Sequence, residues 1–262
     1  MSKKNIVHPL ACVHPKAKLA AGVQIGPYAQ VDEHVKIEAD TKIGTSCVIT
    51  GHASIGKRCN IFTGAVIGSV PQDLKYKGEK TEVIIGDDNV IREYVTVNSG
   101  TQETGKTVIG NKNLLMAYSH VAHDCNIMDE TVIANVGTFA GHVCIEDKAV
   151  VGGMVAIHQF VRVGKLSIIG GCSKVVQDVP PFALVDGHPA RVYGINNTGL
   201  KRAQVDLESV NLIKNAFKIL FNMQLSTSNA LEKIKKELPR NPYVSYLIEF
   251  IESSKRGVCK SN

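Results

Sequence analysis

Four of the nine histidines lie close together in the sequence, namely His120, His123, His142 and His158. An imidazole can take a proton from a hydroxyl near neutral pH, which makes His a frequent general base. Steps of eighteen residues connect His123 with Gly141 and Gln159, and Asp124 with His142. In a fold that repeats every eighteen residues these groups would share one face, and the Gly141 amide could stabilise an oxyanion. The grouping favours a general-base site over isolated, solvated histidines.

A polar segment, SVPQDLKYKGEKTE, carries residues that are suited to binding. Asp73 could orient a sugar hydroxyl, and Lys75 could contact a phosphate. Loops that leave a regular scaffold often serve binding. An exposed charged loop without a function is the alternative interpretation, and the segment alone leaves both open.

The scaffold that must position these residues is a repeat of six. Of the 29 positions taken every sixth residue from Val7 to Val175, 26 are Val, Ile, Leu or Phe. The exceptions are Asp73, Glu79 and Glu103, which indicate loops near 69–84 and 99–108. A period of six matches neither the helical period of about 3.6 nor the simple alternation of a strand.

Such a repeat predicts a short strand and a turn, with the aliphatic residue inward and polar or Gly residues at the bend. Three units would close a triangular coil of eighteen residues, and the coils would stack as parallel strands about 4.8 Å apart. The pattern resembles the hexapeptide-repeat family. The resemblance implies an all-β left-handed parallel β-helix, which we expect over residues 1–195.

Residues 196–262 are expected to form a C-terminal α-helical domain. The segments QDVPPF and GHPARVYG, which precede it, predict an irregular exit from the repeat. Apolar residues within 207–220 have helical spacing. Ser228 is expected to cap a second helix, and Asn241-Pro242 to begin a third.

Composition limits the classes of partner. A net charge of +6 suits an acidic protein or a phosphorylated substrate, and it is too small and scattered to indicate nucleic acid. No apolar run reaches the length of a signal peptide or a membrane span, which predicts a cytoplasmic protein without an integral membrane segment. Cys47, Cys59 and Cys125 fall at small inward positions, so we expect packing groups in a reducing compartment and no metal site.

Short motifs along the chain carry a closer resemblance. They are QDLKY at 72–76, LLM at 114–116, AHDC at 122–125, AGHV at 140–143, GGM at 152–154, HQF at 158–160, GGCS at 170–173, QDVPP at 177–181 and GLKR at 199–202. In this order, and over nearly the whole chain, they resemble the UDP-N-acetylglucosamine O-acyltransferases of lipid A biosynthesis.

The resemblance implies an activity and a set of roles. A 3-hydroxyacyl group would pass from acyl carrier protein to the 3-hydroxyl of UDP-N-acetylglucosamine, without a metal and with no cofactor other than the carrier's phosphopantetheine. His123 would be the general base, the Gly141 amide the oxyanion donor, and Gly171 the residue that limits acyl chain length. The substrate-binding residues would be Asp73, Lys75, His120, Asp124, His142, His158, Gln159, Asn196 and Arg202.

The same family implies a homotrimer with sites between subunits. A basic surface near the site is expected to bind the acidic carrier protein, formed by Lys75, Arg162, Lys165, Arg191 and Arg202. The role of Asp124 has two interpretations, because it could keep the His123 imidazole basic or contact the sugar.

Three positions depart from the family pattern. Asn98 stands where His is frequent, Thr198 where an acidic residue is usual, and Ala203 where a second Arg follows GLKR. The base and the oxyanion Gly are retained, so the departures concern the acceptor. A sugar nucleotide with a 3-amino group is therefore an alternative acceptor.

Three other functions compete. The related N-acyltransferase of the pathway resembles a β-helix behind an extra N-terminal uridine-binding domain, whereas this repeat begins at Val7. A zinc hydro-lyase of the γ-carbonic anhydrase type would need His120, His123 and His142 about 2.0–2.1 Å from one ion, and gives the helical tail no role. A non-enzymatic scaffold protein would leave the histidine cluster unexplained.

Overall fold

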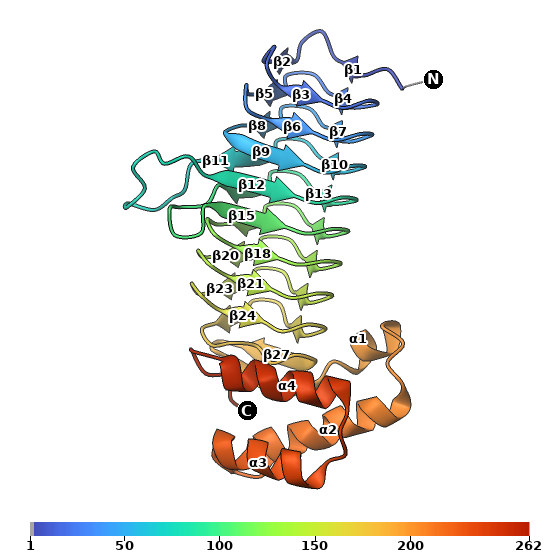
Figure 1. The fold of residues 1–262 in the computed structure, drawn as a ribbon, viewed down its shortest axis with the longest axis vertical. Helices are drawn as coiled ribbons and strands as arrows, with labels where there is room; N and C mark the ends of the chain where they lie inside the picture. The colour runs from blue at the N-terminus through green and yellow to red at the C-terminus, as the bar shows by residue number, and fades with distance from the viewer. Residues whose placement is uncertain (1–2, 262) are drawn as a thin grey trace.

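The computed structural model describes residues 3–261 and shows a triangular prism of stacked coils with helices at its C-terminal end (Figure 1). Successive coils pair in parallel and build three sheets. The strands on the near side in Figure 1 run from left to right while the chain descends from its N-terminus, which is a left-handed turn. The predicted left-handed parallel β-helix is confirmed.

Each sheet takes one strand from each coil. Sheet A contains β1 (Ile6–Val7), β4 (Gln24–Ile25), β7 (Lys42–Ile43), β10 (Asn60–Ile61), β13 (Val90–Ile91), β16 (Leu114–Leu115), β19 (Val132–Ile133), β22 (Val150–Val151), β25 (Ile168–Ile169), β27 (Ala183–Gly187) and β28 (Ala190–Ile195). Sheet B contains β2 (Cys12–Val13), β5 (Gln30–Val31), β8 (Val48–Ile49), β11 (Val66–Ser69), β14 (Thr96–Asn98), β17 (His120–Val121), β20 (Thr138–Phe139), β23 (Ala156–Ile157) and β26 (Lys174–Val175). Sheet C contains β3 (Lys18–Leu19), β6 (Lys36–Ile37), β9 (His52–Ile55), β12 (Glu82–Ile85), β15 (Lys106–Ile109), β18 (Asn126–Ile127), β21 (Cys144–Ile145) and β24 (Arg162–Val163). The chain visits A, B and C in turn, and we call the turns between the sheets the AB, BC and CA corners.

The strand register explains why the six-residue frame survives two interruptions. Gln24 lies opposite Lys42, a step of eighteen residues. Asn60 lies opposite Val90, because the loop 70–81 adds twelve residues to that coil. A second loop, 99–105, adds six residues to the next coil. Both insertions are multiples of six, so the inward positions keep their phase.

The core is a stack of aliphatic side chains. Ile109, Ile127 and Ile145 lie in register in adjacent strands of sheet C, and each is fully buried. Burial is incomplete only where the stack ends: Val7 is 42% exposed, because no coil covers the first one. Cys47, Cys59 and Cys125 are buried within the same core.

The prediction of an irregular exit is confirmed for QDVPPF, which contains no strand, and is wrong for GHPARVYG, which lies in a hairpin. β27 continues sheet A in parallel with β25 and then pairs with β28 in the antiparallel sense. The helices that follow are α1 (Asn197–Arg202), α2 (Leu207–Asn222), α3 (Thr227–Glu237) and α4 (Pro242–Ser253). The cap of α3 is Ser226 and not Ser228, because the Ser226 side chain accepts a hydrogen bond from Asn229 N. Asn241 caps α4 as expected.

Polar contacts attach α4 to the prism. The Tyr246 hydroxyl donates to Glu146 Oε2 at 2.5 Å, and Glu146 also pairs with Arg162 at 3.1 Å. The Arg162 guanidinium lies 4.2 Å from the centre of the Phe250 ring, and Lys165 Nζ lies 5.4 Å from that of Tyr246. Arg162 and Lys165 therefore both help to attach α4 to the prism. Within residues 3–261, none of the helices combines the length and the hydropathy that a membrane span requires.

Candidate active site

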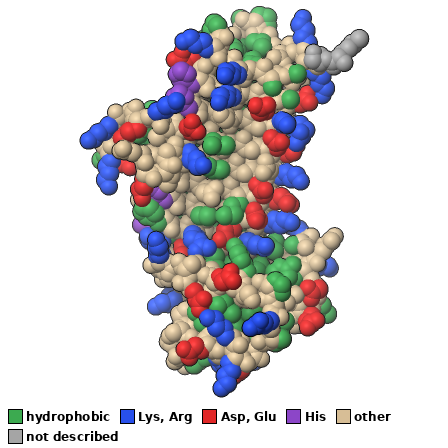
Figure 2. Space-filling view, viewed as in Figure 1, with side chains coloured by type: hydrophobic (Ala, Val, Ile, Leu, Met, Phe, Trp, Pro, Cys, Tyr) green, Lys and Arg blue, Asp and Glu red, His purple; other side chains and the backbone are tan. Residues whose placement is uncertain are grey.

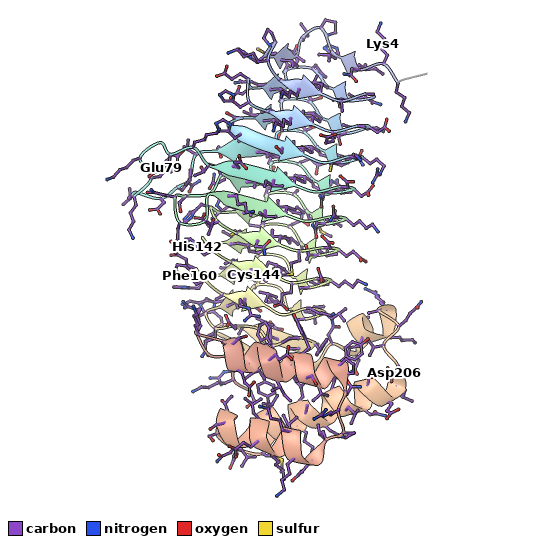
Figure 3. All side chains as sticks on the ribbon, viewed as in Figure 1. Lys4, Glu79, His142, Cys144, Phe160 and Asp206 are labelled. Carbon is purple, nitrogen blue, oxygen red and sulfur yellow. The ribbon has the colours of Figure 1, made fainter. Side chains whose placement is uncertain are left out.

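The BC corner gathers most of the predicted site residues. The turns after β17, β20 and β23 bring His123, His142 and His158 to this corner in three successive coils. The loops 70–81 and 99–105 also lie between a strand of sheet B and one of sheet C. Figure 3 places Glu79 of the first loop on the same edge of the prism as His142 and Phe160. Two polar loops and a histidine column thus share one corner.

His123 and Asp124 form a buried pair. His123 Nδ1 lies 2.7 Å from Asp124 Oδ2, and the Asp124 side chain is fully buried. Since a carboxylate only accepts, Nδ1 carries the proton and Nε2 is left with its lone pair. Burial by itself would raise the pKa of Asp124, but hydrogen bonds from Thr104, His123 and Thr101 lower it below its usual value. The pair can therefore work as an oriented general base.

Gly141 faces the His123 ring from the next coil. A Cβ at this position would collide with the imidazole, so the close approach requires glycine. Its carbonyl accepts from Phe160 N at 3.1 Å, whereas its N–H takes no part in the hydrogen bonds among residues 3–261. The amide remains available to a ligand beside the imidazole.

His142 is held by aromatic contacts. Its ring stacks on Phe160 with centroids 4.5 Å apart, and it meets His123 edge-on at 5.2 Å. Its Nε2 lies 3.4 Å from Glu103 and 3.6 Å from Asp124. Asp124, His142 and Phe160 occupy the same left-handed corner position, with φ of 61°, 61° and 66°. The predicted column is therefore a set of equivalent turns.

The sequence matches known proteins over nearly the whole chain. An acyl-[acyl-carrier-protein]--UDP-N-acetylglucosamine O-acyltransferase of Thermodesulfovibrio yellowstonii is 48% identical over 257 residues, which cover 98% of this chain and 100% of that protein. The chain belongs to this O-acyltransferase family. Residues 178–259 also match the family described as "Udp N-acetylglucosamine O-acyltransferase; Domain 2".

Solved structures of the O-acyltransferase family agree with this fold. LpxA from Bacteroides fragilis, a UDP-N-acetylglucosamine acyltransferase, superposes with a TM-score of 0.95 at 41% identity, over 97% of this chain and 99% of that one. LpxA from Acinetobacter baumannii gives a TM-score of 0.93 at 41% identity, over 97% and 100%. The resemblance found in the motifs is confirmed.

Three further predicted site residues, His120, His158 and Gln159, lie at or next to the BC corner. His120 Nδ1 lies 2.7 Å from the Thr96 hydroxyl. Burial, and to a smaller extent the charge of a protonated His123, lower the pKa of His120. Both effects favour the neutral form of the His120 imidazole. His158 and Gln159 lie two coils beyond His123, where the His158 ring is exposed and its Nδ1 lies 3.1 Å from the Gln159 carbonyl.

Asp73 and Lys75 lie in the loop that projects from the BC corner. The Asp73 carboxylate accepts from Lys75 N at 2.9 Å, and the Lys75 side chain is exposed. Figure 2 shows basic side chains on this projecting loop. Both residues lie on the side of the prism that carries His123.

Three predicted residues lie elsewhere in the same chain. Gly171 is at the AB corner, and Arg202 ends α1, which Figure 1 shows on the side opposite the projecting loops. Asn196 is the cap of α1; its amide donates to the Leu166 carbonyl and accepts from Gly199 N, both at 2.9 Å. These bonds hold the buried Asn196 side chain in the helix cap, and its role in substrate binding stays a prediction.

Residues outside the predicted set complete the site. Thr101 and Thr104 contact the Asp124 carboxylate, and Phe160 supports His142. The threonines lie in a loop outside the regular frame, so no spacing connected them with Asp124. Phe160 follows His142 by eighteen residues, so the spacing indicates its place at this corner but not its contact with the His142 ring.

The residues that could hold a metal ion differ from the three histidines that the zinc hypothesis requires. In the described part of the chain, His123, Asp124 and His142 have ligand atoms within 4.8 Å of one another, while His120 is not in the group. The two Asp124 oxygens already accept hydrogen bonds from His123 and the loop threonines. The three-histidine set that a γ-carbonic anhydrase requires does not converge.

Proposed function

We propose that this enzyme transfers a 3-hydroxyacyl group from acyl carrier protein to the 3-hydroxyl of UDP-N-acetylglucosamine, the first step of lipid A biosynthesis. Family membership supports the reaction class and both substrates. The observation that carries the catalytic assignment is the His123–Asp124 pair, with Nε2 free beside Gly141.

The proposed chemistry needs one base and one oxyanion donor. His123 Nε2 takes the proton of the sugar hydroxyl as its oxygen attacks the thioester carbonyl. The carbonyl oxygen becomes an oxyanion, which accepts a hydrogen bond from the Gly141 amide. The carbon–sulfur bond then breaks, and the thiolate of phosphopantetheine takes the proton from the imidazolium. The reaction requires neither a metal nor a further cofactor.

We also propose a homotrimer with sites between subunits. One residue in each of several coils forms an exposed apolar stripe along the AB corner, consisting of Leu10, Tyr28, Tyr94, Tyr118, Val136 and Met154. Exposed patches of this kind are typical of interfaces. Gly171 lies on this corner and His123 on another. If Gly171 limits the length of the acyl chain bound beside His123, it must therefore belong to a second copy of the chain.

The cellular setting follows from the same proposal. The seven cysteines are free thiols, and four of them are buried. This usage supports a reducing compartment, and we place the reaction in the cytoplasm.

Product analysis tests the proposed function. The enzyme is incubated with acyl carrier protein thioesters of graded length and either UDP-N-acetylglucosamine or its 3-amino analogue. We expect an O-acylated product that retains UDP, with a preference for one chain length. A product formed only with the amino sugar would show that the 3-amino sugar nucleotide is the acceptor. If no thioester gave a product with either acceptor, the proposed function would be wrong.

A further inference from the structure

The loop 99–105 supplies three hydrogen bonds to the Asp124 carboxylate. Thr101 N donates to Oδ1 at 2.9 Å, and the Thr101 hydroxyl donates to Oδ2 at 2.7 Å. The Thr104 hydroxyl donates to Oδ1 as well. With His123 Nδ1 on Oδ2, each carboxylate oxygen accepts two hydrogen bonds. Few lone pairs of this buried group remain for solvent or substrate.

The loop is shaped to present these donors together. Gly105 N donates to the Thr101 carbonyl at 2.7 Å, which closes the segment into a turn. Gly100 packs so closely on the Lys106 backbone that a Cβ would collide with it. Where the loop rejoins the prism, the Thr107 hydroxyl accepts from Asp124 N at 2.8 Å. The backbone and the carboxylate of Asp124 are thus fixed by one segment.

We propose that Thr101 and Thr104 are positioning residues that hold Asp124 oriented toward His123 Nδ1. The inference rests on the proposed function for its catalytic meaning. It also assigns Asp124 to the base and not to the sugar, which the sequence left open. The loop acts through Asp124, since Thr101 and Thr104 touch the carboxylate and not the imidazole.

The orientation matters because an imidazole must present the correct nitrogen. A neutral imidazole has one protonated nitrogen, and the partner of that nitrogen decides which one it is. A fixed carboxylate at Nδ1 keeps Nε2 free to accept a proton. Without the threonine donors the carboxylate can rotate, and His123 can place its proton on Nε2, where it blocks catalysis.

Substitution of both threonines by valine removes the hydroxyls and keeps the shape. For Thr101→Val/Thr104→Val we expect kcat to fall by roughly 10- to 100-fold, the range for a misplaced catalytic group, with KM for the sugar nucleotide nearly unchanged. ¹⁵N NMR of labelled histidine should show the His123 proton moving from Nδ1 toward Nε2. Thr101→Ser/Thr104→Ser should restore both properties.

Thr131→Val is the matched control, because Thr131 is also buried and donates to a side chain, Asn113, at 2.7 Å. It should leave kcat and the His123 tautomer unchanged. Valine variants with wild-type kcat, or with lower kcat but an unchanged tautomer, would overturn the proposal. The NMR measurement does not depend on the acyl transfer reaction. Failure of the positioning proposal can therefore be distinguished from failure of the proposed function. If the double variant does not fold, the single Thr104→Val variant decides, since Thr104 is exposed.

Discussion

The histidines of the BC corner differ in what they can do. His142 lies between the edge of His123 and the face of Phe160, with Glu103 near its Nε2. His123 alone has its Nδ1 on a fully buried carboxylate. Substitution of His142 should therefore affect mainly KM, and substitution of His123 mainly kcat.

For His142→Ala we expect KM for the sugar nucleotide to rise about tenfold, the cost of about one lost hydrogen bond, with kcat changed much less. Steady-state kinetics with varied sugar nucleotide measure both. His14→Ala is the control, since His14 lies at the same corner among the N-terminal coils. A large loss of kcat with unchanged KM would contradict the binding role.

At the scale of single strands, inward and outward neighbours should contribute very differently to stability. Ile127 is fully buried between Ile109 and Ile145, whereas the adjacent Asn126 is exposed. Ile127→Ala should lower the free energy of unfolding by about 2–5 kcal/mol through lost burial and a cavity. Asn126→Ala should change it by less than about 0.5 kcal/mol. Equal shifts in the denaturant midpoint would contradict the stacked core.

The sequence predicted the strands better than it predicted the loops. The six-residue frame indicated the strands because each inward position must be aliphatic, and eighteen-residue steps placed Asp124 beneath His142. The contact of Thr101 with Asp124 had no such rule, because the loop follows its own hydrogen bonds. The hairpin of β27 and β28 was missed for a related reason, since it leaves the frame where Pro and Gly are frequent.

For the whole molecule, the apolar stripe on the AB corner makes assembly testable. Tyr118 is exposed and stacks on Tyr94 with centroids 5.2 Å apart. Tyr118→Glu would place a charge in the proposed interface, so we expect dissociation in analytical ultracentrifugation and loss of activity. Lys112→Glu, at the CA corner, should leave both unchanged. A Tyr118→Glu protein that sediments like the wild type would rule out this interface.

Carrier protein binding should depend on charge. Arg162 and Lys165 support α4, so the attraction depends more on residues such as Lys75, which is exposed on the projecting loop. We expect KM for the acyl carrier thioester to rise with ionic strength, because salt screens exposed charges. An unchanged KM across a salt series would remove the electrostatic contribution.

The central claim is that His123 is the general base, and the most direct measurement is the kcat of His123→Ala. The side chain lies at a corner, outside the aliphatic stack, so thermal stability and assembly should be nearly unchanged. We expect kcat to fall by at least about 10²-fold, the lower limit for loss of general-base catalysis, while His14→Ala keeps the wild-type rate. A folded His123→Ala enzyme that turns over near the wild-type rate would contradict the mechanism, even though the fold and the family would stand.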